Sequence, residues 1–194
     1  MLLLQECWKD LFLLHLCQWS VAWDISHLLT ARAASVSAGL DSEVRTVLEI
    51  ISRFRDLPPD PTECGCMKTI VLFKPETAGL AEPRSVEVLQ DQAQCILADY
   101  VRNRYLSQTT RYMVNMCVQK LYNIEDNSRL FFQPVELNKH PLSVSRFGRL
   151  LLVIPLLRMV KATLVETLFF RETVGETNIK NIILGNLNSK KSSS

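Results

Sequence analysis

Apolar residues recur along much of this chain at the spacing of amphipathic α-helices. In residues 41–56 the apolar positions are Val44, Val47, Leu48, Ile51 and Phe54. Asp41 stands before them as a candidate N-cap. A longer helix with a similar stripe is predicted for residues 83–106. No run of alternating residues is long enough to predict a strand, so we expect an all-α protein of stacked helices with short connections.

The first predicted helix, residues 2–19, changes character along its length. Its first half places Glu6, Lys9 and Asp10 on one arc, whereas later apolar residues spread around the helix. Such a helix begins at the surface and enters the core. These charges and the lack of a basic start argue against a signal peptide. The uncharged run at residues 11–23 is shorter than the roughly 20 residues that span a bilayer, so we expect no membrane segment.

Local signals predict where the next elements begin and end. Residues 19–30 are expected to turn or form a small ribbon before another helical turn, and residues 31–39, rich in Ala, Ser and Gly, to form a loop. Residues 60–63, Asp-Pro-Thr-Glu, have the order of a capping box with proline in the first turn. The helix that follows should end before Pro75.

The longest uninterrupted apolar run is residues 150–157. On a helix this run covers every side, and a helix that is apolar all round is buried all round. Pro155 predicts a kink that turns residues 161–170 back onto the core. Gly175 is a candidate helix stop before a short apolar segment at residues 179–187. We therefore expect the run to contact its own core on one side and a second subunit on the other.

Residues 112–145 interrupt the helical pattern. The segment begins apolar, becomes mixed and contains Pro134 and Pro141. Because connections of this length are uncommon inside compact domains, we expect an insertion that is irregular or disordered. The remainder of residues 1–187 forms one domain in this prediction, and residues 188–194 form a disordered tail.

Composition narrows the class of protein. The chain has 194 residues, of which 47% are hydrophobic and 22% charged, as expected for a globular domain. The net charge of +2 is too small to indicate nucleic-acid binding. Six cysteines and three histidines show no metal-ligand spacing, so we expect a reduced, intracellular protein without metal. No nucleophile motif or phosphate loop occurs, and a thiol enzyme using Cys64 or Cys66 is the least favoured alternative.

Several segments, in this order, resemble the ligand-binding domain of nuclear receptors, and within that family the Tailless-like subfamily. The sequence LLLQECWKDLFLLHLCQW resembles the family's central helix, and ISRFRDLPPDPTECGCMKTIVLFKPETAGL its seventh and eighth helices. VEVLQDQAQ resembles the ninth helix, and RFGRLLLVIPLLRMV with LFFRETVG the tenth and eleventh. The order and spacing of the segments are more specific than any one of them. The resemblance implies an antiparallel helical sandwich.

The resemblance also implies departures from the family pattern. The family's first and third helices, and its two-zinc-finger DNA-binding module, have no counterpart in these residues. Zinc and DNA contacts would therefore belong to the parent family, and we expect no cofactor here. Joining Arg111 to Phe147 would restore the family pattern, in agreement with the expected insertion. The chain is thus expected to be an incomplete ligand-binding domain of an orphan nuclear receptor, located in the nucleus.

Four residues of the central helix are candidates for a ligand pocket: Trp8, Phe12, His15 and Trp19. Trp19 stands where retinoid X receptors hold an arginine for the carboxylate of an acidic ligand. An indole cannot pair with a carboxylate bidentately, so we expect no retinoid-like acid and a small or filled pocket. We expect His15 to be a hydrogen-bonded core histidine rather than a ligand contact, and Trp8 to be structural.

The resemblance assigns dimerisation to the ninth and tenth helices. The residues expected to form that interface are Arg149, Leu151, Val153, Pro155, Leu156 and Arg158. Val153 replaces a residue that is charged in retinoid X receptors, which makes the predicted face more apolar. The partner would be a second copy or another nuclear receptor. The alternative is that this helix only packs in the core.

The terminal segment is the expected coregulator site, with Ile182, Ile183, Gly185 and Leu187 as its candidate residues. Gly185 stands where the family has an acid that caps a partner helix, and the third-helix lysine lies outside the chain. We therefore expect poor coactivator recruitment, corepressor partners and a repressor-like, self-occluded groove. A second hypothesis is a truncated isoform that only dimerises and titrates the full-length receptor.

Overall fold

The computed structural model describes residues 1–36, 41–122 and 142–191, and every regular element among them is helical. The helices are α1 (Leu2–Ser20), α2 (Ser26–Val36), α3 (Asp41–Asp56), α4 (Pro61–Leu72), α5 (Pro83–Tyr122), α6 (Leu142–Leu151), α7 (Val153–Met159), α8 (Ala162–Val165), the π-helix η3 (Glu166–Phe170), α9 (Arg171–Val174) and α10 (Ile179–Lys191). The all-α prediction is confirmed.

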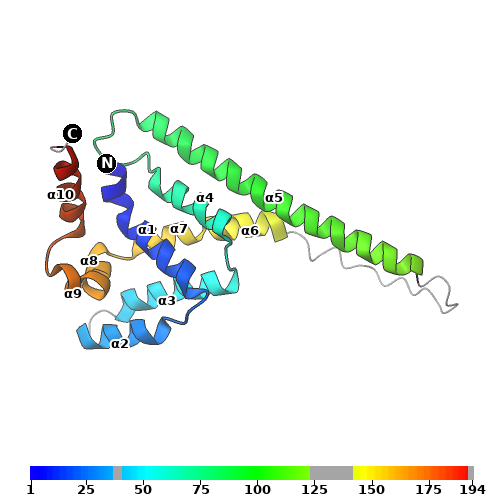
Figure 1. Ribbon diagram of the computed structural model, residues 1–194, viewed down its shortest axis with the longest axis horizontal. Helices are drawn as coiled ribbons and strands as arrows, with labels where there is room; N and C mark the ends of the chain where they lie inside the picture. Colours follow the sequence, from blue (N-terminus) through cyan, green and yellow to red (C-terminus); the bar gives the residue numbers. More distant parts are fainter. Residues whose placement is uncertain (37–40, 123–141, 192–194) are drawn as a thin grey trace.

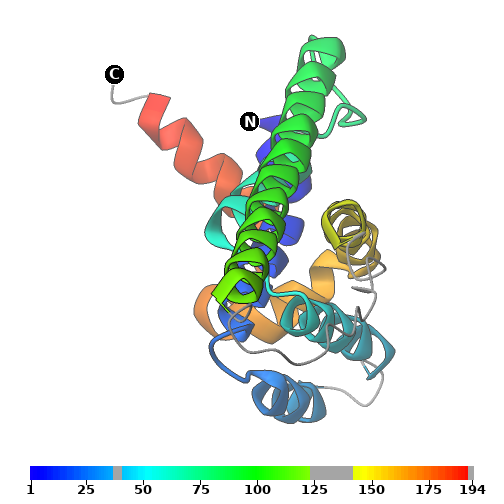
Figure 2. The same ribbon diagram turned by 90° about the vertical axis from the view of Figure 1, so that its right-hand side faces the viewer.

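Helix α1 lies at the centre of the fold and contacts α3, α4, α7 and α10. Figure 1 shows α5 along one side of the molecule and the pair α2–α3 along the other, with α1 between them. The first half of α5 packs against α4 and α6, and the rest extends beyond them. In Figure 2, α10 runs outward from the body, so only its first turns lie against α1.

One hydrophobic core joins the central helices. Its members with almost no exposed surface include Leu13 of α1, Phe54 of α3, Met67 of α4, Leu97 of α5 and Leu157 of α7. Full burial of an apolar side chain of this size contributes about 1.5–3 kcal/mol. The same cluster includes residues of α8 and η3, so the C-terminal third of the chain is held by the same core as α1.

One predicted helix start and one predicted helix stop are confirmed. The side chain of Asp60 accepts hydrogen bonds from the backbone N–H groups of Thr62 and Glu63, and Glu63 accepts one from the Asp60 N–H in return. This is the capping box that the sequence predicted. Gly175 follows α9 with φ of 69°, a conformation that glycine adopts without the cost of a Cβ.

The predicted loop at residues 31–39 is wrong where the structure describes it, because α2 continues to Val36. Alanine has the highest intrinsic helix propensity, so the alanines of this segment favour a helix although the neighbouring Ser and Gly suggested a loop. Leu29 and Ala33, four residues apart, are both buried and fix one face of α2 on the body. Asp24 accepts a hydrogen bond from the backbone N–H of Ser26 at 2.9 Å, which orders the start of this helix.

The irregular segment predicted for residues 112–145 is helical at both ends. Helix α5 continues through Tyr122, and α6 already begins at Leu142. Residues 188–191, predicted to be a disordered tail, belong to α10. The remaining positions of both predictions, residues 123–141 and 192–194, lie outside the described part of the chain.

The apolar run at residues 150–157 contains the predicted break. Helix α6 ends at Leu151, a turn follows at Leu152, and α7 begins at Val153. Pro155 lies in the first turn of α7, where its missing N–H needs no partner, and its ring prevents a helical bond to the Leu151 carbonyl. Helix α7, which follows this break, packs on both α1 and α3.

Candidate functional surfaces

Aromatic rings connect the central helix to the π-helix. The ring of Phe12 lies 5.0 Å from both Phe169 and Phe170, centroid to centroid, and Trp8 meets Phe170 edge-on at 6.1 Å. Trp8 is 7% exposed and belongs to the core. Trp8 and Phe12, two of the four predicted pocket residues, thus pack together with rings of η3. This packing joins α1 to η3.

The other two predicted pocket residues lie outside the core. His15 is exposed, and its Nδ1 is 3.2 Å from the ammonium of Lys68 on α4. The prediction of a core histidine is therefore wrong. Trp19 is 62% exposed and packs against His15 in a tilted arrangement, with ring centroids 4.9 Å apart. The Trp19 side chain therefore does not fill space inside the described core. The face of α1 that is buried at Trp8 is exposed to solvent near the C-terminal end of the helix.

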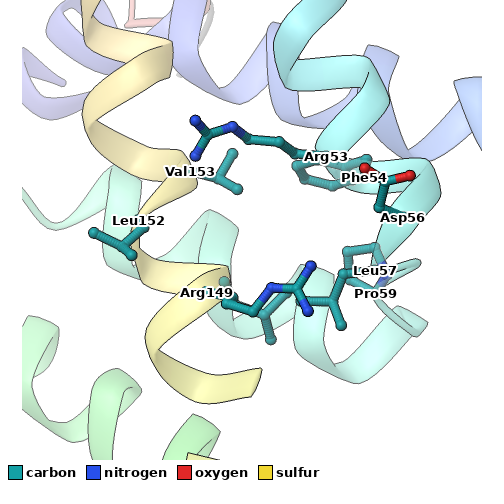
Figure 3. Close-up of a pocket in the computed structure, with 9 residues that line it drawn as sticks. Arg53, Phe54, Asp56, Leu57, Pro59, Arg149, Leu152 and Val153 are labelled. Atoms are coloured by element: carbon teal, nitrogen blue, oxygen red, sulfur yellow. The ribbon is translucent and has the colours of Figure 1, made fainter. Parts of the chain in front are cut away.

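A cleft of about 190 Å³ lies between the end of α3 and the α6–α7 junction. Figure 3 shows Arg149 reaching from α6 across the cleft, while Leu152 points away from it. Its lining residues are Arg53, Phe54, Asp56, Leu57, Pro59, Arg149, Leu150, Leu152 and Val153. None of the four predicted pocket residues belongs to this set.

The predicted dimer residues lie on two sides of α6 and α7. Val153 is only 5% exposed and belongs to the core, so it cannot face a partner, contrary to the prediction. Arg149, Pro155 and Arg158 are exposed, and Leu151 and Leu156 are half-buried. Two residues that the prediction missed are the most exposed apolar side chains here, Leu152 at 63% and Met159 at 68%.

We call the surface formed by Leu152, Pro155, Leu156 and Met159 the α7 flank. Pro155 and Leu156 lie three and four residues after Leu152, and four and three residues before Met159, so the four residues share one side of the helix. The opposite side carries Val153, Ile154 and Leu157, all buried in the core. One side of the apolar run is thus covered by its own chain, as predicted, and the other side is open in the single chain.

Lys9 fixes α7 against the central helix, a role that the sequence analysis missed. Its ammonium donates to the carbonyl oxygens of Leu157 at 2.9 Å and Val160 at 2.6 Å. It also lies 2.8 Å from Oδ1 of Asp10, a carboxylate with little exposed surface. A cation at a helix C-terminus satisfies carbonyls that lack helical partners. The sequence signal for this role was the adjacent charged residues Lys9 and Asp10, just before the helix becomes apolar.

A buried ion pair joins α4 to α6. The guanidinium of Arg146 donates to both carboxylate oxygens of Glu63, from Nε and Nη2, at 2.6 Å each. Glu63 is fully buried and Arg146 nearly so. This bidentate pair joins residues that precede and follow α5 in the sequence, so it fixes α6 against α4.

The N-cap of α4 is tied to α5. Asp60 Oδ2 accepts hydrogen bonds from Tyr100 Oη at 2.8 Å and from Arg104 at 2.6 Å. Burial alone would raise the pKa of Asp60, but the N–H of Glu63, the Tyr100 hydroxyl and the Arg104 charge outweigh it and lower the pKa. The ionised form of Asp60 therefore stabilises the α4–α5 contact.

The terminal helix α10 is held by a few polar and apolar contacts. The carboxylate of Glu166 in η3 accepts the N–H of Ile179 at 2.9 Å, and Lys180 pairs with Glu6 of α1 at 2.8 Å. Ile183 packs against the core, and Ile182 is half-buried. Among the other predicted coregulator residues, Gly185 is exposed, and the side chain of Leu187 lies outside the described residues.

The cysteine side chains that the structure describes are free thiols. Burial raises the pKa of Cys7 and of Cys64 to about 11, and that of Cys17 to about 12. Within residues 1–36, 41–122 and 142–191, no group of three or more His, Cys, Asp or Glu could hold a metal ion. None of the described helices is both long and apolar enough to cross a membrane.

Comparison with known proteins identifies the family. Residues 1–174 match the family model of the ligand-binding domain of nuclear hormone receptors. Because this match covers most of the chain and agrees with the all-helical fold, the chain belongs to the family of nuclear receptor ligand-binding domains. Members of this family are transcription factors rather than enzymes.

Similar proteins include members of nuclear receptor subfamily 2. The chain is 34% identical to group F member 6 of Rattus norvegicus over 188 residues, which cover 93% of this chain and 39% of that protein. It is 33% identical to group F member 6 of Homo sapiens and 31% identical to group F member 5 of Danio rerio, again over 93% of this chain. The chain spans about 39% of the length of these relatives.

Proposed function

We propose that this chain is the ligand-binding and dimerisation domain of an orphan nuclear receptor, a repressor-like transcription regulator that acts in the nucleus. It pairs through the α7 flank with a nuclear receptor domain, and it docks corepressors rather than coactivators. Residues 1–187 act as one partial domain. It needs no cofactor of its own, since zinc and DNA contacts belong to the finger module of the parent family.

The observation that supports dimerisation is the pair of opposite surfaces on α7. Val153, Ile154 and Leu157 anchor the helix in the core, while Leu152 and Met159 expose about two-thirds of their surface on the other side. An apolar surface on a helix that the core holds rigidly is typical of an interface. Because this surface is already ordered by the core, it loses little conformational entropy when a partner binds.

The test is the oligomeric state of the full chain and of a Leu152→Asp variant, measured by sedimentation velocity. A carboxylate on the flank should weaken association at least about tenfold, since it would be buried without a partner. Leu28→Asp in α2 is the matched control, because Leu28 is 62% exposed against 63% for Leu152. Equal effects of the two substitutions would refute dimerisation through this flank, and a chain that is monomeric at every concentration would refute pairing between two copies of this chain.

The repressor-like part of the proposal rests on α10. Gly185 puts no carboxylate where the family resemblance expects one, and nothing lies within 4 Å of a Cβ built there. The chain, tethered to DNA through a heterologous binding domain, should lower the expression of a reporter gene. A Gly185→Glu variant should shift the balance toward activation. A tethered chain that leaves expression unchanged, yet still associates through the flank, would instead act only as a dimerisation adaptor.

We also propose that the chain is closest to the photoreceptor-specific nuclear receptor of the Tailless-like subfamily. The segment from residue 51 to 80 and the sequence RFGRLLLVIPLLRMV support this placement. The group F relatives are at 31–34% identity. A phylogenetic tree that includes full-length members of both subgroups tests the placement, and clustering with group F would overturn it.

A further inference from the structure

His15 and Lys68 join the central helix to α4 at the exposed margin of their contact. The Lys68 ammonium lies 3.2 Å from Nδ1 of His15 and donates to Oε1 of Gln18 at 2.8 Å. An ammonium has no acceptor, so its hydrogen bond to His15 requires an unprotonated Nδ1. The link between α1 and α4 at this point therefore depends on a neutral imidazole.

The same imidazole has a second neighbour on its own helix. The Trp19 ring lies one turn after His15, with its centroid 4.9 Å from that of the imidazole and an interplanar angle of 52°. An aromatic face attracts a cation within about 6 Å of its centroid, and tryptophan does so most strongly. Trp19 thus favours the protonated imidazole, whereas Lys68 favours the neutral one.

Helix α4 offers no negative charge to this contact. Among the described residues, no carboxylate is bonded to His15 or Lys68. The carboxylates of α4 are held by arginines of other helices: Asp60 by Arg104 and Glu63 by Arg146. Burial raises the pKa of the Cys64 thiol to about 11 and also raises the pKa of Cys66, so both thiols stay neutral near pH 7. A second positive charge beside Lys68 would therefore be repelled.

The other charged groups around α1 lie toward its two ends. Those at the N-terminal end are Glu6 with Lys180 of α10, Lys9 with Asp10, Lys74 and Arg158 of α7, and those beyond the C-terminal end are Asp24 with Arg55 of α3. Glu6 and Asp24 are each nine residues from His15 in the sequence. Lys68 is thus the charge that the protonation of His15 affects most directly.

From this arrangement we infer that His15 is a proton-dependent switch between two partners. The neutral imidazole accepts from Lys68 and links α1 to α4. The protonated imidazole is repelled by the ammonium and stays against Trp19, while Lys68 keeps its bond to Gln18. An imidazole ordinarily gains its second proton between about pH 8 and 5, so the exchange falls in that range. Because one weak attraction replaces another, overall stability changes little and the effect is local to the α1–α4 surface.

Tryptophan emission of the full chain between about pH 8 and 5 tests the exchange, because an imidazolium beside an indole quenches its fluorescence. We expect a reversible fall in emission across this range. His15→Gln should abolish the fall, since an amide can accept from Lys68 but does not titrate. Trp19→Phe should also abolish it, because the quenched indole is gone. A fall that persists in His15→Gln, or no fall in the wild type, would overturn the inference.

The matched controls are His27→Gln and Trp23→Phe. Both side chains are exposed, and Trp23 is 74% exposed against 62% for Trp19. Each control should keep the fall in emission, and circular dichroism verifies that every variant is folded across the pH range. If His27→Gln removed the fall as completely as His15→Gln, the titration would not belong to His15 and the inference would be wrong.

Amide hydrogen exchange, corrected for its intrinsic pH dependence, tests the release of Lys68. Protection of residues 65–69 should decrease about two- to fivefold between about pH 7.5 and 5.5 in the wild type, as expected for the loss of one exposed polar link. It should stay constant in His15→Gln. Unchanged protection in the wild type would show that the α1–α4 link survives protonation, which would overturn the exchange of partners even if the emission falls.

Discussion

At the residue scale, the fold depends on one charge that has no access to water. Glu63 has no exposed side-chain surface, and both of its oxygens accept hydrogen bonds from Arg146. We expect Glu63→Gln to lower the free energy of unfolding by about 3–5 kcal/mol, because it removes the buried carboxylate that accepts both charge-assisted hydrogen bonds from Arg146. Urea denaturation followed by circular dichroism measures this loss.

The control for that measurement is Glu87→Gln on the surface of α5. Glu87 pairs with Arg84 at 2.8 Å in a solvent-exposed i,i+3 arrangement. Such pairs contribute about 0–1 kcal/mol, so the control should unfold almost like the wild type. Similar losses in the two variants would contradict a special role for the buried pair.

Cysteine reactivity is a second prediction at this scale. Cys7, Cys17 and Cys64 have raised thiol pKa values because they are buried, whereas Cys95 is exposed on α5. Since the thiolate is the reactive form, iodoacetamide at pH 7.5 should modify Cys95 first and leave the three buried thiols intact. Peptide mass spectrometry of the folded and the urea-unfolded chain reads out each site. Rapid modification of Cys17 in the folded chain would show that α1 is not buried as described.

At the element scale, two glycines at the C-terminal end should respond in opposite ways to alanine. Gly175 ends α9 with positive φ, so Gly175→Ala strains the backbone and should lower stability by about 1 kcal/mol or more. Gly185 lies inside α10 with no atom near its missing Cβ, so Gly185→Ala should raise helix stability by about 0.5–1 kcal/mol. Amide hydrogen exchange of α10 in both variants tests these two predictions. Slower exchange in Gly175→Ala than in the wild type would contradict the first of them.

The helices also show how far sequence patterns reach. The capping box at Asp60 was predictable because its partners lie within three residues of one another. The Glu63–Arg146 pair was not, because it joins positions 83 residues apart whose meeting depends on how α4, α5 and α6 pack. Residues 150–157 contain no polar side chain, so their pattern does not show which side of the helix faces the core. The sequence therefore did not indicate that Val153 faces inward and Leu152 outward. Similarly, helical spacing placed His15 on the face of Trp8, but only packing shows where α1 leaves the core.

At the scale of the whole molecule, three carboxylates link parts of the chain that are far apart in sequence, and all three have lowered pKa values. Glu6 binds Lys180 of α10, Asp24 binds Arg55 of α3, and Asp60 binds groups on α5. Hydrogen bonds from these cations lower the pKa of Glu6 and of Asp24. For Asp60 the bonded groups lower the pKa despite its burial. All three carboxylates are therefore ionised near neutral pH, and the links to their cations are formed there.

Acid should loosen these links together. A group whose pKa is lowered by folding contributes stability above its unfolded pKa, about 4 for Asp and Glu, and loses it as the pH falls through its folded pKa. The urea midpoint should thus be level from about pH 7 to 5 and fall below about pH 4. Asp60→Asn should flatten part of that fall, whereas Asp99→Asn, within α5, should not. A midpoint that rises on acidification would contradict this assignment.

The short π-helix η3 has a mechanical consequence for the C-terminal third of the chain. Within five consecutive residues it supplies the rings of Phe169 and Phe170 that touch Phe12, and the carboxylate of Glu166 that receives the first N–H of α10. A molecule that displaced those rings would also move Glu166, because the rings and this carboxylate belong to the same turn of helix. Because Glu166 holds the first N–H of α10, a change in the packing of these rings would alter the orientation of α10.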